Sequence, residues 1–166
     1  MSTTHRNSPP TFDFKITQRV ISSILIPTDF SPASWNATQV ALELSRLNSD
    51  LVISLLHIYP NSSRYTHKNN LLPENKLDEV RGRMNQLAQG LLDHSEDKIK
   101  NVVLSGNVED TLLQFIKEHD FDLVIVGINS NGQNNDIGSH TVSVIKESGV
   151  PVMIVPNKLV DGAIAS

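Results

Sequence analysis

Cysteine is absent from the 166-residue chain, and its absence excludes three kinds of chemistry at once. A disulfide scaffold, a thiolate zinc site and a cysteine nucleophile are all ruled out. The chain also lacks an excess of positive charge, because its formal net charge is −4. Proteins that bind nucleic acid usually carry a basic stripe, so we expect no nucleic-acid partner. No apolar run approaches the roughly 20 residues that cross a bilayer, so we expect no membrane partner either.

What the sequence does contain fits one globular domain. Hydrophobic residues make up 39% of the chain and charged residues 19%, which is compatible with a sizeable core. Residues 1–20 are polar, include Pro9-Pro10, and lack the apolar run of a signal peptide. We predict a flexible tail over 1–20, a folded domain over 21–157 and a short tail over 158–166. We also predict a cytoplasmic location.

Short apolar segments alternate with segments of helical periodicity along the folded domain. In chain order, the predicted strands are 21–27, 51–60, 101–106, 121–127 and 150–156. The first predicted helix runs from Ser31 to near Asn48, and its apolar face includes Leu47. The other three begin near Glu74, at Val108 and at residue 138, and the last of them ends at residue 148. Ser31 is a natural N-cap, and Pro32 suits the first helical position. Strands that are apolar throughout and alternate with amphipathic helices indicate a parallel sheet covered on both faces. A doubly wound α/β fold is therefore predicted.

A loop rich in Gly, Ser and Asn follows the fourth predicted strand. Ligands of doubly wound sheets bind at the carboxyl ends of the strands, so the residues of interest are 27–31, 57–60, 105–107 and 127–141. The last of these ranges has the character of a phosphate-binding loop that leads into a helix. It contains no Lys or Arg, however, and its one charged residue is Asp136. A triphosphate would find backbone amides there but no local cation.

Four stretches of the sequence, in the right order and spacing, resemble universal stress proteins. They are "ILIPTDFSPASWNA", "LLHIYP", "SGNVEDTLLQFIKEHDFDLVIVG" and "GSHTVSVIKESGVPVMIVP", and together they cover about residues 22–156. The resemblance implies a five-stranded parallel sheet in the order 3-2-1-4-5, with helices on both faces, in an adenine nucleotide alpha hydrolase-like α/β fold. It also implies a stress-response module and a homodimer, often paired through the last strand, Val150–Pro156.

The loop after the fourth strand departs from G-x2-G-x9-G-[ST], the pattern of the ATP-binding members of that family. Gly127 matches the first glycine, and Gly138-Ser139 matches the closing pair. Ser130 stands where the pattern has its second glycine, and Gly132 is out of register. Gly138 follows Gly127 by 11 positions rather than 13, so the loop is two residues short. We therefore favour weak or absent ATP binding.

The family's binding positions, carried over residue by residue, give a candidate nucleotide site. Its residues are Pro27, Thr28, Asp29, Ile58, Gly127, Gly138, Ser139 and Thr141. The resemblance implies that Asp29 contacts the nucleoside, that the backbone of Ile58 meets adenine, and that the last four residues hold phosphate. Plainer explanations stay open: Asp29 can be a turn residue, and Gly127 can belong to a tight turn. Ser139 or Asp136 can simply cap the following helix.

Histidines and the single tryptophan offer further candidate sites. No two of the six histidines have i, i+4 spacing, so we predict no metal site. We expect His57 at a strand end, with its ring satisfied by backbone. We expect Trp35 to pack or to anchor an interface rather than to stack on a base. No cofactor is certain from the sequence, and the candidates are ATP or AMP with Mg²⁺.

Functions from other classes have less support. The G-x-S-x-G and G-x4-G-K-[ST] patterns of two enzyme classes are absent. Ser105-Gly106 stands where a phosphoacceptor signalling domain would need an aspartate. An interaction scaffold with an apolar last strand is compatible with the family resemblance. The alternative that stays open is a working ATP or adenine-nucleotide sensor, with slow ATP hydrolysis if ATP binds.

Overall fold

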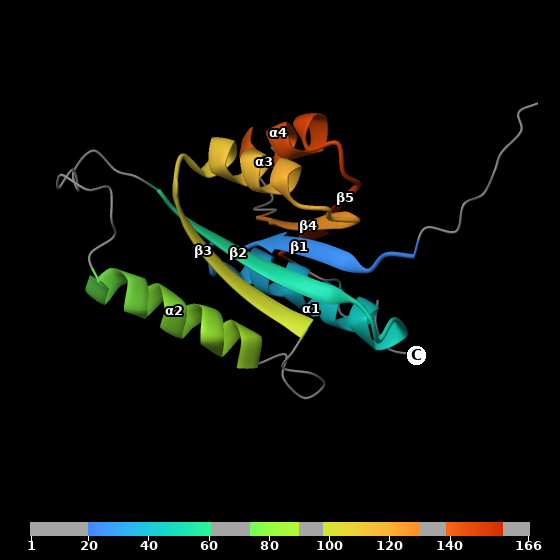
Figure 1. Ribbon diagram of the computed structural model, residues 1–166, viewed down its shortest axis with the longest axis horizontal. Helices are drawn as coiled ribbons and strands as arrows, with labels where there is room; N and C mark the ends of the chain where they lie inside the picture. Colours follow the sequence, from blue (N-terminus) through green and yellow to red (C-terminus); the bar gives the residue numbers. More distant parts are fainter. Residues whose placement is uncertain (1–19, 61–73, 90–97, 130–138, 158–166) are drawn as a thin grey trace, which may run out of the picture.

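The computed structural model describes residues 20–60, 74–89, 98–129 and 139–157 (Figure 1). Both predicted tails lie outside these ranges, apart from Val20. Their flexibility and the exact limits of the folded domain therefore stay predictions.

Helices and strands alternate along the described residues in the predicted order. They are β1 (Ser23–Pro27), α1 (Pro32–Leu47), β2 (Val52–Pro60), α2 (Glu74–Gln89), β3 (Ile99–Gly106), α3 (Val108–Glu118), β4 (Leu123–Ile128), α4 (Ser139–Glu147) and β5 (Val152–Pro156). All five strands pair in parallel, in the order β3-β2-β1-β4-β5. This confirms the doubly wound five-stranded sheet and its 3-2-1-4-5 order.

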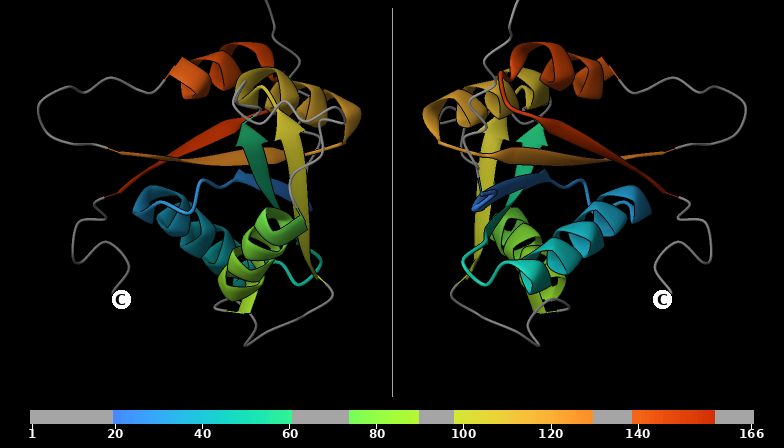
Figure 2. Two further views of the ribbon diagram at one scale, coloured as in Figure 1. Left: turned by 90° about the vertical axis from the view of Figure 1, so that its left-hand side faces the viewer. Right: turned by 90° about the vertical axis from the view of Figure 1, so that its right-hand side faces the viewer.

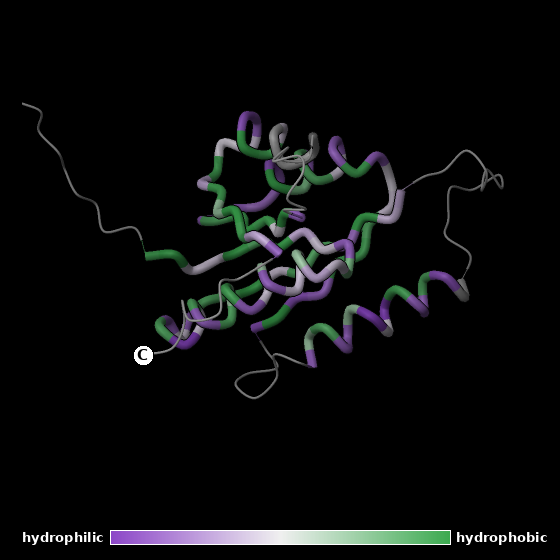
Figure 3. The backbone as a smooth tube through the Cα atoms, turned by 180° about the vertical axis from the view of Figure 1, so that it is seen from behind, coloured by the Kyte–Doolittle hydropathy of each residue, from purple (hydrophilic) through white to green (hydrophobic). Residues whose placement is uncertain are grey.

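Helices cover both faces of the sheet (Figure 2). Helices α1 and α2 lie on one face, and α3 and α4 lie on the other. Hydrophobic and hydrophilic residues alternate along α2, as expected of a helix with one face on a sheet (Figure 3). Among the helices that the structure describes, none has both the length and the apolar character that spanning a bilayer requires.

Alternate residues of the central strand supply two separate cores. Ile24 and Ile26 belong to the core beneath α1 and α2. Leu25, between them, packs into the core beneath α3 and α4. All three side chains are completely buried. Because successive strand residues point to opposite faces, a strand with a core on each side must be apolar throughout, which is the pattern that predicts it.

The ends of α1 are capped by the residues that the sequence indicates. Ser31 Oγ accepts a hydrogen bond from the Ser34 backbone N–H at 3.3 Å. At the other end the Asn48 N–H donates to the Leu44 carbonyl oxygen. The prediction that Leu47 belongs to the apolar face is wrong, because this last helical residue is 86% exposed and no longer faces the sheet.

Strand β3 begins at Ile99, two residues before the predicted start at Asn101. It pairs with β2 along its whole length. Lys100 and Asn101 are both exposed. Backbone hydrogen bonds, which an apolar pattern does not reveal, therefore define this end of the strand.

Gly127 lies in β4 against the first turn of α1. A methyl group on its Cα would overlap the Ala33 carbonyl and would lie 2.6 Å from the Ser34 backbone nitrogen. Gly127 is not among the glycines with positive φ, and it lies within a strand. The tight-turn explanation is therefore wrong: glycine is needed here because the helix backbone packs so closely on the strand.

Alanine at two glycine positions should have opposite effects on stability. Gly127→Ala should lower the free energy of unfolding by about 1–3 kcal/mol, because α1 must move away from β4. Gly82→Ala is the matched control, since an added methyl group in α2 meets nothing within 4 Å. It should raise the free energy of unfolding by about 0.5–1 kcal/mol. Urea denaturation measures both, and equal effects at the two positions would contradict the close packing.

Candidate functional site

A network of hydrogen bonds fixes the turn between β1 and α1. The Thr28 N–H donates to the Leu56 carbonyl oxygen at 2.8 Å. Thr28 Oγ1 accepts from the Phe30 N–H at 3.1 Å and donates to Ser34 Oγ at 3.1 Å. The Ser34 hydroxyl donates in turn to the Ser31 carbonyl oxygen at 3.0 Å. Because Thr28 and Ser34 are buried, these bonds hold the turn firmly against the start of α1.

Asp29 stands exposed at the edge of this turn. Its Oδ1 accepts a hydrogen bond from the Ser31 N–H at 2.9 Å. Partial burial by itself would raise the pKa of Asp29, but hydrogen bonds from Ser31 and Ser34 outweigh it and hold the pKa below its ordinary value. The carboxylate is therefore ionised at neutral pH. Asp29 is thus a turn residue, as the plainer explanation states, and it also borders a cavity.

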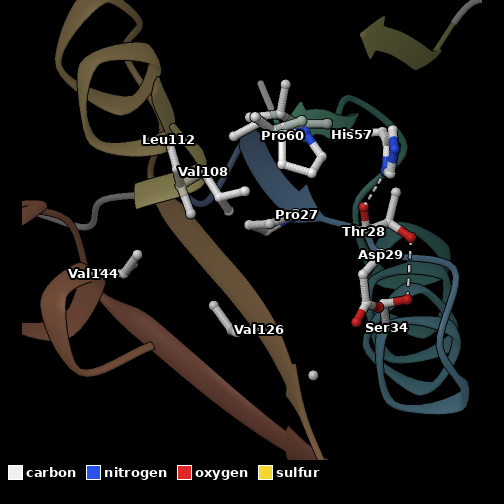
Figure 4. Close-up of a pocket in the computed structure, with 13 residues that line it drawn as sticks. Pro27, Thr28, Asp29, Ser34, His57, Pro60, Val108, Leu112, Val126 and Val144 are labelled. Atoms are coloured by element: carbon white, nitrogen blue, oxygen red, sulfur yellow. Dashed lines mark hydrogen bonds between the residues drawn. The ribbon is translucent and has the colours of Figure 1, made fainter. Parts of the chain in front are cut away.

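A pocket of about 330 Å³ opens at the carboxyl ends of the central strands. Its lining residues are Pro27, Thr28, Asp29, Ser34, Leu56, His57, Ile58, Pro60, Val108, Leu112, Val126, Gly127 and Val144. Figure 4 shows an apolar half made by β4, α3 and α4, facing a polar half made by the β1 turn and the start of α1. Asp29 is the only acidic side chain among these described lining residues, and none of them is a lysine or an arginine.

The structure brings most of the predicted site residues together in this pocket. Those that line it are Pro27, Thr28, Asp29, Ile58 and Gly127. Gly138 lies outside the described residues. Ser139 and Thr141 belong to the first turn of α4, but their side chains lie outside the described part of the structure.

Sequence reasoning missed the apolar half of the pocket and Ser34. Val108 and Leu112 come from α3, and Val144 comes from α4. Helical periodicity indicates that Val108 and Leu112 face inward, but it does not say that they border a cavity. Ser34 could have been noticed, because it is a polar residue two positions after Pro32 on the otherwise apolar side of α1 that faces the sheet.

The His57 ring is satisfied by backbone, as the sequence analysis predicts. Its Nδ1 lies 2.8 Å from the Thr28 carbonyl oxygen. A carbonyl oxygen can only accept, so Nδ1 carries a proton. The ring points away from the apolar half of the pocket (Figure 4). It packs against Phe30, with 4.5 Å between ring centroids. Among the described residues, no three His, Asp or Glu side chains gather as a metal site would require.

Phe30 has a left-handed backbone conformation that is unusual for a large side chain. Its φ is 63°, and no other non-glycine residue in the described ranges has a positive φ. This conformation costs an L-residue about 1–2 kcal/mol. The ring packs on His57, and the Arg83 guanidinium carbon lies 5.6 Å from the ring centroid. These contacts and the bond to Thr28 Oγ1 offset the strain.

The strain at Phe30 should reverse the usual ranking of alanine over glycine. Phe30→Ala and Phe30→Gly both lose the ring contacts, but only glycine adopts a positive φ without strain. We expect the Gly variant to be the more stable of the two by about 1 kcal/mol in urea denaturation. An Ala variant that is equally or more stable would mean that the backbone at position 30 is not left-handed.

The fold and the pocket define an α/β domain with a cavity at the point where the strand order reverses, which is where sheets of this kind bind ligands. The model of the universal stress protein family matches residues 21–156. The chain therefore belongs to the universal stress protein family, as the four sequence stretches predict.

Curated relatives and one solved structure agree with this assignment. Universal stress protein MJ0577 of Methanocaldococcus jannaschii is 28% identical over 159 residues, which cover 81% of this chain and 94% of that protein. Its solved structure matches with a TM-score of 0.66 over 84% of this chain and 98% of that chain. Universal stress protein G of Salmonella typhimurium is 26% identical over 139 residues, which cover 80% of this chain and 97% of that protein.

Two other solved structures share the fold and contain nucleotides. A universal stress protein family protein from Arabidopsis thaliana with AMP bound is 18% identical, with a TM-score of 0.60, over 84% of this chain and 94% of that chain. A universal stress protein from Archaeoglobus fulgidus in complex with dAMP is 15% identical, with a TM-score of 0.60, over 82% of this chain and 98% of that chain. At these identities the likeness establishes the fold alone.

Proposed function

We propose that this chain is a stress-response module whose pocket takes adenosine or an adenine nucleoside monophosphate and binds ATP weakly or not at all. The composition of the pocket carries the proposal. An apolar half faces a polar rim on which Asp29 is the only acidic side chain described, with no lysine or arginine beside it. A volume of about 330 Å³ lies in the range of small-molecule sites.

Each half of the pocket suits one part of a nucleoside. Val126 and Val144 offer apolar surface for a base. The Asp29 carboxylate can accept hydrogen bonds from ribose hydroxyls. The N-terminus of α4 at Ser139 offers backbone amides for one phosphate. The relatives from Arabidopsis thaliana and Archaeoglobus fulgidus, which hold AMP and dAMP, support this ligand class.

Electrostatics favour a monophosphate over a triphosphate. Two like unit charges 4 Å apart repel by about 1 kcal/mol in water and by about 4 kcal/mol at an effective dielectric constant of 20. Asp29 is ionised at neutral pH and has no cationic partner among the described lining residues. The stretch from Gly127 to Thr141 adds only the negative charge of Asp136. Because 1.4 kcal/mol corresponds to a tenfold change in affinity, each added phosphate should weaken binding measurably.

The proposal includes a homodimer that pairs through Val150–Pro156. Strand β5 is at one edge of the described sheet. Met153 is 37% exposed, and the strand is apolar along its length. Apolar edge strands in natural proteins are usually covered, which supports pairing at this edge. The cytoplasmic location inferred from the sequence stays a prediction.

Calorimetric titration with adenosine, AMP, ADP and ATP, each with and without Mg²⁺, tests the proposed ligand. We expect AMP to bind at least about tenfold more tightly than ATP. Asp29→Asn should weaken AMP binding about tenfold, since bonds to a charged acceptor are worth about 1.5–3 kcal/mol. The amide oxygen can still accept from Ser31, so the turn should persist. Asp50→Asn is the matched control, because Asp50 is exposed and does not line the pocket.

Two other outcomes have definite meanings. ATP binding that is tighter than AMP binding and is lost in Asp29→Asn would support the alternative, a working ATP sensor, and would justify an assay for slow hydrolysis. No heat and no thermal shift from any of the four compounds would contradict the proposed ligand. The dimer surface would then be the place to look for function.

A further inference from the structure

A second pocket of about 340 Å³ lies between the start of α1 and the C-terminal half of α2. Both helices are on the same face of the sheet (Figure 2). Phe30, Ser31, Ser34 and Trp35 form one wall, and Arg83, Gln86 and Leu87 form the other. Only Ser34 also lines the first pocket. The second pocket is therefore a separate cavity with its own set of side chains.

The walls of the second pocket offer aromatic and apolar surface. Trp35 is 40% exposed, so part of its indole ring is open to a ligand. Leu87 is 8% exposed. Phe30 adds an aromatic ring that its left-handed backbone holds in place. A flat apolar group could therefore stack on the indole ring and be shielded from water.

Arg83 gives the second pocket a positive charge that its neighbours do not neutralise well. Its guanidinium lies 3.5 Å from Glu79 Oε1, longer than the about 2.7–2.9 Å of a good charge-assisted hydrogen bond. Glu79 already accepts a bond from Lys76 at 2.9 Å. None of the described residues that line the pocket is acidic. Glu79 does not line the pocket, so an anionic ligand there would share the Arg83 guanidinium with Glu79 rather than face an acidic wall.

The donors available in the second pocket favour a carboxylate over a phosphate. Phosphate sites gather several donors, but the backbone amides at the start of α1 are occupied: Ser34 N–H donates to Ser31 Oγ, and Trp35 N–H donates to the Ser31 carbonyl oxygen. Among the described residues that line the pocket, Arg83 is the only cation, and the other side-chain donors, such as those of Gln86 and Trp35, are neutral. The planar fork of the Arg83 guanidinium matches the two oxygens of a carboxylate.

We propose that the second pocket binds a small aromatic carboxylate, with its ring on Trp35 and its carboxylate on Arg83. The ligand is a one-ring compound, because one guanidinium takes one carboxylate and the Trp35 indole is the platform left for a ring, since the Phe30 ring already contacts His57 and Arg83. This site is independent of the first pocket and does not require that a nucleotide binds there.

The only tryptophan of the chain lies in this pocket, so its fluorescence reports on the site directly. Benzoate is the probe, and neutral benzamide is its uncharged counterpart. We expect benzoate to change the emission of Trp35 saturably and benzamide to bind at least about tenfold more weakly. Arg83→Gln should weaken benzoate binding at least about tenfold, and Arg83→Lys, which keeps the charge but loses the fork, should be intermediate.

Arg81→Gln is the matched control on the same helix. Arg81 is 62% exposed and does not line the pocket, so its loss should leave benzoate binding within about twofold. Thermal melts verify that each variant is folded. Absence of a saturable change up to about 10 mM benzoate, an equal response to benzamide, or unchanged binding by folded Arg83→Gln protein would overturn the proposal.

AMP distinguishes this site from a second nucleotide site. Saturating AMP should leave the benzoate titration unchanged, because the two pockets share only Ser34. Displacement of benzoate by AMP, together with sensitivity to Arg83→Gln, would assign the pocket to nucleotides and would overturn the aromatic carboxylate. Failure of AMP to bind anywhere would count against the proposed function but not against this site.

Discussion

The close packing of α1 on β4 at Gly127 is the constraint on which the first pocket depends. Because Gly127 has no side chain, the Ala33–Ser34 backbone can approach the strand. Ser34 then reaches Thr28, and Thr28 holds the backbone of the following turn. Asp29 is left at the rim of the cavity as a result. The absence of a side chain at Gly127 in β4 thus allows the start of α1 to pack closely enough to position the turn that follows β1.

The same arrangement separates two cavities of opposite character. The first has a carboxylate on its rim and no lysine or arginine among the described residues that line it. The second has a guanidinium and no acid among its described lining residues. Phe30 stands on the side of the second cavity, and its strained backbone follows directly after Asp29. The turn from Asp29 to Phe30 therefore contributes to both cavities, while Arg83 reaches the second cavity from α2.

Most of the fold could be predicted because its signals are local. A strand with a core on each side must be apolar throughout, as Ile24, Leu25 and Ile26 are. Ser31 and Pro32 mark the start of α1 for reasons that involve only neighbouring residues. Predictions failed where tertiary contacts decide. Backbone pairing with β2 extends β3 to Ile99, before its predicted start. Leu47, the last residue of α1, is exposed because it no longer faces the sheet.

The candidate site was less predictable, because its parts come from separate elements. Asp29 and Ile58 lie in the ranges selected by the rule that ligands bind at carboxyl ends of strands, and the family resemblance names them within those ranges. Val144 could not be found in this way, because it lies inside a helix and not at the carboxyl end of a strand. Gly127 is the clearest case: its position suggests phosphate contact or a tight turn, whereas the structure shows that a helix backbone requires it. A glycine in a sequence does not reveal which neighbour needs the space.

The proposal that matters most is that an adenine nucleoside monophosphate binds in the cavity at the carboxyl ends of β1, β2 and β4. Two-dimensional NMR of ¹⁵N-labelled protein titrated with AMP tests it most directly, because every backbone amide reports its own position. We expect the largest shifts on the amides of Thr28, Asp29, Ile58 and Gly127. Shifts confined to α2, or no shifts at all, would contradict it.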